Sequence, residues 1–207
     1  MKNSGVRALL LGLAAVRVVI AFLAIPLGPI LYEKHFVLLV LMRPTKDVLL
    51  AAGFLLRLGK VDWVPVLAAA IPLAIFGVWQ FFFLGRMYAD QINSGKLPSW
   101  AQRVLPPKRI RAMQKLIDRK GTRIIFLGRL AVFPSAVLAA AAGSAKMEPR
   151  QFLPVDGIAG LLSIAEVIGA GFGLGYAYKR AGPWITLAGV AVLVAVAVIV
   201  ARFLRRT

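Results

Sequence analysis

Apolar residues run in long blocks along this chain, and polar residues gather between the blocks instead of alternating with apolar ones. Four blocks are long enough to cross a hydrocarbon core, which takes about 20 helical residues, and they lie near 8–30, 63–85, 153–177 and 183–203. Two shorter blocks, 36–56 and 124–143, are interrupted by proline and by charged residues. The pattern predicts an all-α integral membrane protein with about four full spans.

The two interrupted blocks are poor candidates for full spans. Their prolines and charges are Arg43, Pro44, Lys46 and Asp47 in the first block and Arg129 and Pro134 in the second. Charge at the middle of a membrane is costly unless it faces protein or water, and broken backbone survives there only where protein or a cavity covers it. We therefore expect both blocks to be re-entrant hairpins, which fold back inside the membrane.

The chain also repeats itself at an offset of 90 residues: Pro44, Gly53 and Gly85 recur as Pro134, Gly143 and Gly175. Each copy would hold one hairpin followed by one span. We expect the proline and the first glycine of each copy to mark the hairpin breaks. Copies that enter the membrane from opposite faces form an inverted repeat, which is typical of secondary transporters with broken helices at the midplane.

Charge predicts the orientation of this fold. The chain has 26 lysines and arginines against 8 acidic residues, and the basic residues concentrate between 86 and 123. The positive-inside rule makes this loop cytoplasmic. If the interrupted blocks are hairpins, both termini fall on the same side as the loop.

The basic loop contains a helical pattern of its own. After Pro106-Pro107, one helical face carries Ile110, Met113, Leu116 and Ile117, which predicts a basic amphipathic surface helix. Two interpretations stay open for its cations. They either sit on a solvated linker that fixes topology, or they contact anionic headgroups.

Composition excludes several other classes of protein. With 60% hydrophobic residues, the chain is too apolar for an ordinary soluble domain. It has no cysteine and a single histidine, His35, so we expect no metal centre, no thiol chemistry and no cofactor. The net charge of +18 comes without aromatic residues interleaved among the cations, so we expect no nucleic-acid partner.

These elements divide the chain into three parts. An N-terminal transmembrane helix is expected at 1–35, where Arg17 within the apolar stretch argues against a cleaved signal peptide. A C-terminal helix with a basic tail is expected at 183–207, after a brief turn at Lys179-Arg180. The central part, 36–180, would hold the repeat as hairpin 36–56, span 63–85, basic loop 86–123, hairpin 124–143 and span 153–177.

Motifs in the central part resemble the DedA or VTT-domain (SNARE-associated) membrane proteins. Between Gly128 and Leu153 the family's positions are filled by Arg129, Pro134, Ala142-Gly143, Lys146-Met147 and Phe152. In the first half, GVWQFFFLGR from Gly77 to Arg86 is similar to the family's Gly-Asp-x-x-x-Tyr-x-x-Gly-Arg, and RPTKD from Arg43 to Asp47 is similar to its Pro-x-acid hairpin. The resemblance covers about 36–180.

The resemblance implies two opposed re-entrant hairpins plus membrane helices. It also implies lipid transport, by flipping or scrambling phospholipids or recycling polyprenyl-phosphate carriers, with proton motive force as the energy source in bacterial members. The chain departs from the family at Val78, Phe82 and Ser135, where an acid, a tyrosine and an arginine are common. A member with these substitutions would bind a different headgroup or move lipid without proton coupling.

The charges on the hairpins form a candidate binding site. An anionic phosphate headgroup needs cations, and Arg129, Arg43 and Lys46 lie where the two halves should converge. Arginine can grip phosphate through a bidentate fork. Two alternatives stay open: Arg129 caps hairpin carbonyls, and Arg43 and Lys46 pair with Asp47 or extend to the surface.

Asp47 and Glu166 are the candidates for proton or ion coupling, because a carboxylate desolvated at membrane depth takes up a proton more readily. Asp47 alternatively forms a static ion pair with Lys46 or Arg43. Glu166 is alone in the third span, so we expect it to face protein or water.

Asp156, near the cytoplasmic end of the third span, is expected to be a helix-end partner for Lys146 or Arg150 instead. Its position close to the start of the predicted span and to two cations favours that assignment over a role in coupling.

We expect a membrane lipid transporter, a flippase or scramblase whose partner is an anionic phospholipid or polyprenyl phosphate, and not an enzyme. A membrane-embedded lipid enzyme would have to use Ser135 or Ser163 with Glu166. A non-transporting assembly or scaffold protein would carry the same fold with inert charges. The expected location is a bacterial plasma (inner) membrane with both termini cytoplasmic, and a homo-oligomer is left open.

Overall fold

The structure, a computed structural model, describes residues 4–94, 102, 106–131 and 133–204, and it describes residues 181–204 by their backbone alone. The described part of the chain is helical and contains no strand, which confirms the predicted all-α class. Its helices are α1 (Ser4–Lys34), α2 (Phe36–Met42), α3 (Lys46–Leu58), α4 (Trp63–Met87), α5 (Ala89–Ser94), α7 (Pro107–Lys120), α8 (Thr122–Leu130), α9 (Ser135–Ser144) and α10 (Pro149–Leu204).

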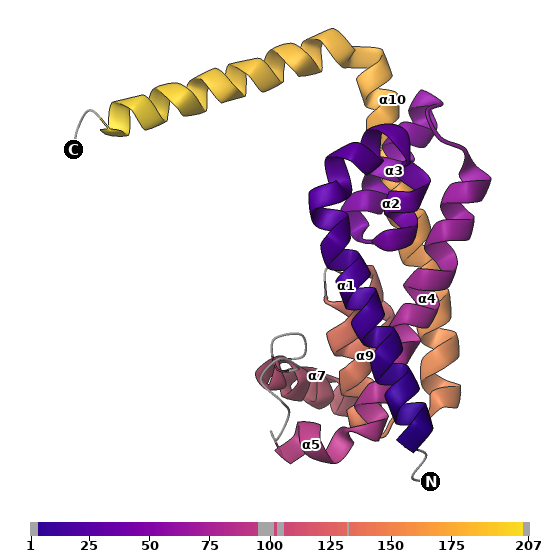
Figure 1. The fold of residues 1–207 in the computed structure, drawn as a ribbon. Coiled ribbons are helices and arrows are strands. Elements are labelled where there is room, and N and C mark those ends of the chain that lie inside the picture. The colour runs from indigo at the N-terminus through magenta and orange to yellow at the C-terminus, as the bar shows by residue number, and fades with distance from the viewer. Residues whose placement is uncertain (1–3, 95–101, 103–105, 132, 205–207) are drawn as a thin grey trace.

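Three helices in the described residues are long and apolar enough to cross a membrane: Ala8–Lys34, Trp63–Met87 and Pro149–Arg180. They match the first three predicted spans to within a few residues. Figure 1 shows α1, α4 and α10 along the length of the bundle, with α2 and α3 toward one end and α5, α7 and α9 toward the other. The side chains of the predicted fourth span, 183–203, lie outside the described residues.

The expected turn at Lys179-Arg180 is absent, because α10 continues without interruption from Pro149 to Leu204. Figure 1 shows this helix bending and its C-terminal part turning away from the bundle. Gly182-Pro183 lies within the helix, and proline bends a helix because it lacks an amide donor and crowds the preceding turn. The two residues therefore account for a bend in the helix where a turn was expected.

Each interrupted block forms two short helices on either side of its proline. The chain leaves α2 at Arg43 and enters α3 at Lys46, and it leaves α8 at Ala131 and enters α9 at Ser135. Proline suits the start of a helix, where the amide that it lacks would have no partner. The interruptions predicted at Pro44 and Pro134 are therefore present.

Helix α3 packs along α10, and glycines on both helices allow close approach. A Cβ at Gly53 would overlap the backbone of Ile168 and Phe172, and one at Gly171 would overlap the backbone of Leu50. Small residues at such contacts let two helix backbones meet directly. Helix α3 of the first pair is thus held by a helix far along the chain, whereas α2 packs on α1 and α4.

Helix α9 packs along α4 through the same kind of contact. A Cβ at Gly143 would overlap the backbone of Phe82 and Arg86, and one at Gly85 would overlap the backbone of Ala140. Helix α9 of the second pair is therefore held by a helix that precedes it in the chain, whereas α8 packs on α10.

The two glycine contacts match each other closely, but not with the register expected from sequence. Gly53 and Gly143 make equivalent contacts, as the 90-residue offset predicts. The offset also pairs Gly85 with Gly175, but the contact equivalent to that of Gly85 is made by Gly171, and Gly175 lies over Arg57. The shift is four residues, about one helical turn, so it keeps the same helix face turned inward.

Two separate groups of buried apolar side chains fill the bundle. The first apolar core joins α1, α2, α3, the early part of α4 and the later part of α10, and it includes Val40, Leu49, Val66, Ala70 and Ile168. The second apolar core joins the later part of α4, the start of α10 and α5, α7, α8 and α9, and it includes Phe82, Ile110, Ile125, Leu138 and Phe152. Rings of Phe82 and Phe152 stack with their centroids 4.3 Å apart.

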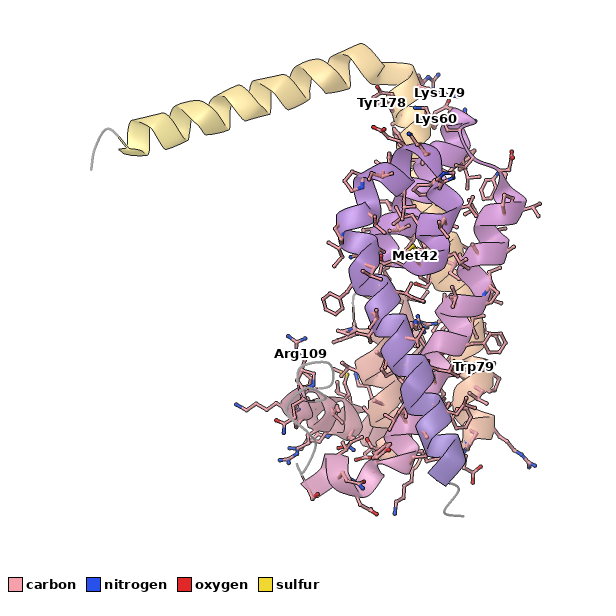
Figure 2. The ribbon with its side chains drawn as sticks, viewed as in Figure 1. Met42, Lys60, Trp79, Arg109, Tyr178 and Lys179 are labelled. Carbon is pink, nitrogen blue, oxygen red and sulfur yellow. The ribbon has the colours of Figure 1, made fainter. Side chains whose placement is uncertain are left out.

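Helix α7 confirms the amphipathic helix that the basic loop predicted. Ile110 and Ile117 are buried in the second apolar core, and Met113 and Leu116 pack against it. Its cations face outward, and Arg109 is seen on the outside of the molecule in Figure 2.

Candidate functional site

Arg129 lies at the end of α8 and is buried at the centre of the bundle. Its side chain is only 7% exposed. Nη2 donates a hydrogen bond of 2.6 Å to the carbonyl of Ala74 in α4, and Nε lies 3.2 Å from Oδ1 of Asp156 in α10. Three helices therefore meet at one guanidinium.

Asp156 is the carboxylate that balances this charge, and it is 1% exposed. The indole Nε1 of Trp79, a residue labelled on α4 in Figure 2, and the second carboxylate oxygen of Asp156, Oδ2, are both buried without a hydrogen-bond partner among the described residues. A buried ion pair is costly to desolvate and persists only where its geometry is good. The expected pairing of Asp156 with Lys146 or Arg150 is wrong, because Asp156 follows Phe152 by four residues and shares its buried helix face.

The pair lies between the two apolar cores. In α4 the first core ends at Ala74 and the second begins at Val78, while in α10 the second core ends at Val155 and the first resumes at Ile164. Arg129 and Asp156 occupy the layer between these segments. The molecule thus has a polar layer across its middle, with an apolar core on each side.

Lys46 joins the two chain interruptions. Its Nζ donates hydrogen bonds of 2.8 Å to the carbonyl of Leu130 and 3.0 Å to that of Ala131. The last carbonyls of a helix have no partner within the helix and carry partial negative charge, so a lysine there satisfies both needs. Lys46 therefore caps α8, a role that the sequence analysis considered for Arg129.

Arg43 and Asp47 form an ion pair at the start of α3, with Nη2 and Oδ2 3.4 Å apart. The two side chains are 34% and 64% exposed. Neither is joined to Arg129, so the structure brings only Lys46 to the end of α8. Both residues line an open, largely apolar cavity of about 510 Å³ between α1, α2 and α3.

Glu166 is exposed on the outer face of α10. It belongs to the segment Pro149–Arg180, which is apolar enough to cross a membrane. Of the two surroundings expected for Glu166, protein or water, the described part of the chain does not supply protein, and the expectation of water stays a prediction.

Arg17 is a partly buried cation whose Nη1 is fully buried, and the sequence analysis used it only as an argument against a signal peptide. Its guanidinium fills the space above Gly77 in α4, where a Cβ would overlap it. Its charge and that of Arg129 repel one another. Leu10, Arg17, Ala24 and Leu31 recur every seven residues, and this spacing on one helix face is the signal that could have placed Arg17 inward.

These features define a helical membrane protein in which two interrupted helix pairs, one helix of each held by a distant span, meet beside buried charges. The profile of the VTT domain matches residues 44–173, more than half of the chain. The chain belongs to this family, the VTT-domain or DedA family.

Two curated relatives are the inner membrane protein YghB of Escherichia coli K12 and the protein of the same name from Escherichia coli O6:H1. Each is 28% identical to this chain over 131 residues, which cover 63% of this chain and 58% of the relative. The chain thus matches less than two thirds of the relatives' length. No solved structure matches the chain.

Proposed function

We propose that this chain is a membrane transporter for lipids that carry a phosphate group. The observation that carries the proposal is Arg129, a buried cation held by three helices in the polar layer, at the end of one interrupted helix. Charged residues within membrane segments are costly and mark substrate or ion pathways. An arginine there suits an anionic headgroup such as that of a phospholipid or a polyprenyl phosphate.

The interrupted helices are proposed to be re-entrant hairpins of an inverted repeat. Matching close contacts at Gly53 and Gly143 support this arrangement, because one helix of each interrupted pair, α3 or α9, packs on the span of the other copy. The bond from Lys46 to the end of α8 supports it further, because the two interruptions then meet at one depth. Transporters with such repeats bind substrate where their broken helices meet.

Arg43 and Lys46 are proposed to assist Arg129 in taking up the headgroup. The open cavity between α1, α2 and α3 combines Arg43 and Asp47 with apolar residues such as Ile25, Phe36 and Leu39. A lipid needs both kinds of surface, since its headgroup is charged and its chains are apolar. The cavity is therefore the proposed entry for lipid.

Coupling to a proton gradient is proposed to use Asp47, whose carboxylate pairs with Arg43 at the start of α3. Its exposed carboxylate is reachable by water. Glu166 is exposed on an apolar helix and is the second candidate.

We place the protein among transporters and not among enzymes. Ser135 or Ser163 with Glu166 was considered for a membrane-embedded lipid enzyme. Ser163 and Glu166 lie on two faces of α10, because Ser163 is buried and Glu166 is exposed, and Ser135 lies on another helix, at the start of α9. A nucleophile must lie within hydrogen-bond reach of its base.

The proposed location is a bacterial inner membrane with the N-terminus cytoplasmic, whereas the return of the C-terminus to that side would need the turn that α10 does not make. The relatives' name supports the membrane. Figure 1 supports the N-terminal orientation, since the start of α1 lies at the same end of the bundle as α5 and the basic helix α7, and cations favour the cytoplasmic side.

The test is transport of fluorescent phosphatidylglycerol or polyprenyl phosphate in liposomes holding the purified chain, with and without a pH gradient. Wild type is expected to move lipid, Arg129→Ala to abolish movement, and Asp47→Asn to abolish only its dependence on the gradient. Arg57→Gln is the matched control, because Arg57 stacks on Phe172 and Tyr176 away from the proposed pathway. A wild-type protein that moves neither lipid would contradict the proposal and favour a scaffold role.

A further inference from the structure

Arg17 is placed in the interior by the packing of α1. Positions 10, 17, 24 and 31 share one face of this helix because seven residues make almost two turns. Ala24 and Leu31 on that face are buried in the first apolar core. The side-chain Nε2 of Gln80 in α4 donates a hydrogen bond of 2.8 Å to the backbone carbonyl of Leu10. The face that carries Arg17 is thus fixed against α4 on both sides of it.

The guanidinium of Arg17 has an unmet need for an acceptor. Its Nη1 is fully buried and has no hydrogen-bond partner among the residues that the structure describes. A buried donor without a partner costs the desolvation of that group, and more so when the group is charged. Gly77 leaves the room that this guanidinium occupies, since a side chain there would displace it.

The charges around Arg17 do not balance. Arg129 is close enough to repel it, and the one carboxylate buried among the described side chains, Asp156, is paired with Arg129. Two guanidinium groups therefore face one carboxylate in a layer between two apolar cores. An uncompensated positive charge remains, and an anion is the ligand that would neutralise it.

We propose that Arg17 and Arg129 together bind a phosphate group in the polar layer, with Arg17 supplying the second guanidinium from α1. Arg17 lies outside residues 44–173, which match the VTT domain, so this chain would add a binding residue from its own first span. The inference rests on the proposed function and names a further residue of that site. The phosphate belongs either to a lipid headgroup or to free inorganic phosphate.

Binding is measured with the full chain in dodecyl maltoside, a detergent without phosphate, by titrating spin-labelled phosphatidylglycerol. Loss of one charge-assisted contact is expected to weaken binding about 10- to 100-fold in Arg17→Gln. Arg17→Lys is expected to retain part of the affinity, because it keeps the charge and loses the fork. The matched control is again Arg57→Gln, another arginine with a buried nitrogen that lacks a hydrogen-bond partner, and its affinity should stay within about twofold of wild type, since exposed or stacked cations away from a site change affinity little.

A second readout separates a ligand-binding role from a structural one. Without anionic lipid, Arg17→Leu is expected to raise the unfolding temperature, because it removes a repelled, unpartnered charge. With phosphatidylglycerol, wild type should gain thermal stability and Arg17→Leu should gain none. If Arg17 had a structural role instead, Arg17→Leu would lower the unfolding temperature in the absence of anionic lipid.

Two arms identify the phosphate source and separate the two proposals. Competition by inorganic phosphate supports a site for free phosphate, whereas lipid binding that phosphate leaves unchanged supports a headgroup site. Unchanged lipid binding in Arg17→Gln, with binding lost in Arg129→Gln, overturns the role of Arg17 and leaves the proposed transporter intact. Unchanged binding in both variants overturns the phosphate site as a whole.

Discussion

At the scale of single residues, the central feature is that Arg129 has one acidic partner and a backbone acceptor. Sequence patterns placed Arg129 at the second interruption, but they did not find Asp156. The two are 27 positions apart on helices that meet only after folding, and nothing periodic in the chain relates them. The same holds for Arg17, whose unmet donor depends on the packing of α1 against Gly77.

Breaking the buried pair is expected to destabilise the protein. Asp156→Leu leaves Arg129 buried without its counter-charge, which costs about 3–5 kcal/mol. The double variant Arg129→Met with Asp156→Leu should lose less than the sum of the single changes, because neither charge then remains. Unfolding in mixed micelles with rising SDS measures the free energies.

The exposed pair of Arg43 and Asp47 provides the control for this experiment. Exposed ion pairs contribute about 0–1 kcal/mol, so Asp47→Leu should have a small effect. An equal loss of stability at Asp47 and Asp156 would contradict the difference in burial that separates the two pairs.

At the scale of helices, glycines determine which helices meet. The prolines and glycines of the repeat were visible in the sequence, and the interruptions at Pro44 and Pro134 follow from local chemistry. The one-turn shift in the spans was not visible, because Gly171 and Gly175 lie on nearly the same helix face and only their contacts distinguish them.

Glycines of α10 allow a matched test of this packing. Gly171→Ala is expected to destabilise by about 1–3 kcal/mol, since its Cβ would overlap the backbone of Leu50. Gly173→Ala, where nothing lies within 4 Å of the added Cβ, should be neutral or stabilise by up to about 1 kcal/mol through helix propensity. Equal effects in thermal unfolding would show that α3 does not pack on α10 at this glycine.

The cap on α8 provides a second test at this scale. Lys46→Met removes two hydrogen bonds to the carbonyls at the end of α8, and hydrogen bonds from a charged group are worth about 1.5–3 kcal/mol. Hydrogen exchange of the amides of residues 122–131 should become faster. Lys60→Met, at an exposed lysine, is the control and should leave that exchange unchanged.

At the scale of the whole molecule, the apolar blocks predicted the first three spans to within a few residues, because hydropathy depends on composition and not on partners. The position of Glu166 could not be predicted in this way. A lone charged residue in an apolar helix indicates a free-energy cost in the membrane, but it does not tell which side of the helix packs on the rest of the protein. The charges of the loops, by contrast, predict which end of the bundle is cytoplasmic.

The absence of cysteine makes the orientation directly testable. Figure 2 shows Lys60 and Arg109 toward opposite ends of the bundle, and both are exposed. In sealed right-side-out vesicles, a membrane-impermeant maleimide should label Lys60→Cys and not Arg109→Cys, and inverted vesicles should give the reverse. Labelling of both variants from one side would contradict the single crossing by α4 that separates them.

Each half of the chain packs one short helix on a span of the other half, α3 on α10 and α9 on α4. This arrangement also affects how the protein is made. Helix α3 emerges from the ribosome well before the part of α10 against which Gly53 packs, so it enters the membrane without its final neighbour. Helix α9 finds α4 already in place. Until α10 has been made, the face of α3 that carries Gly53 therefore has no partner helix. A translation product that stops after α4 would expose this face to the insertion machinery.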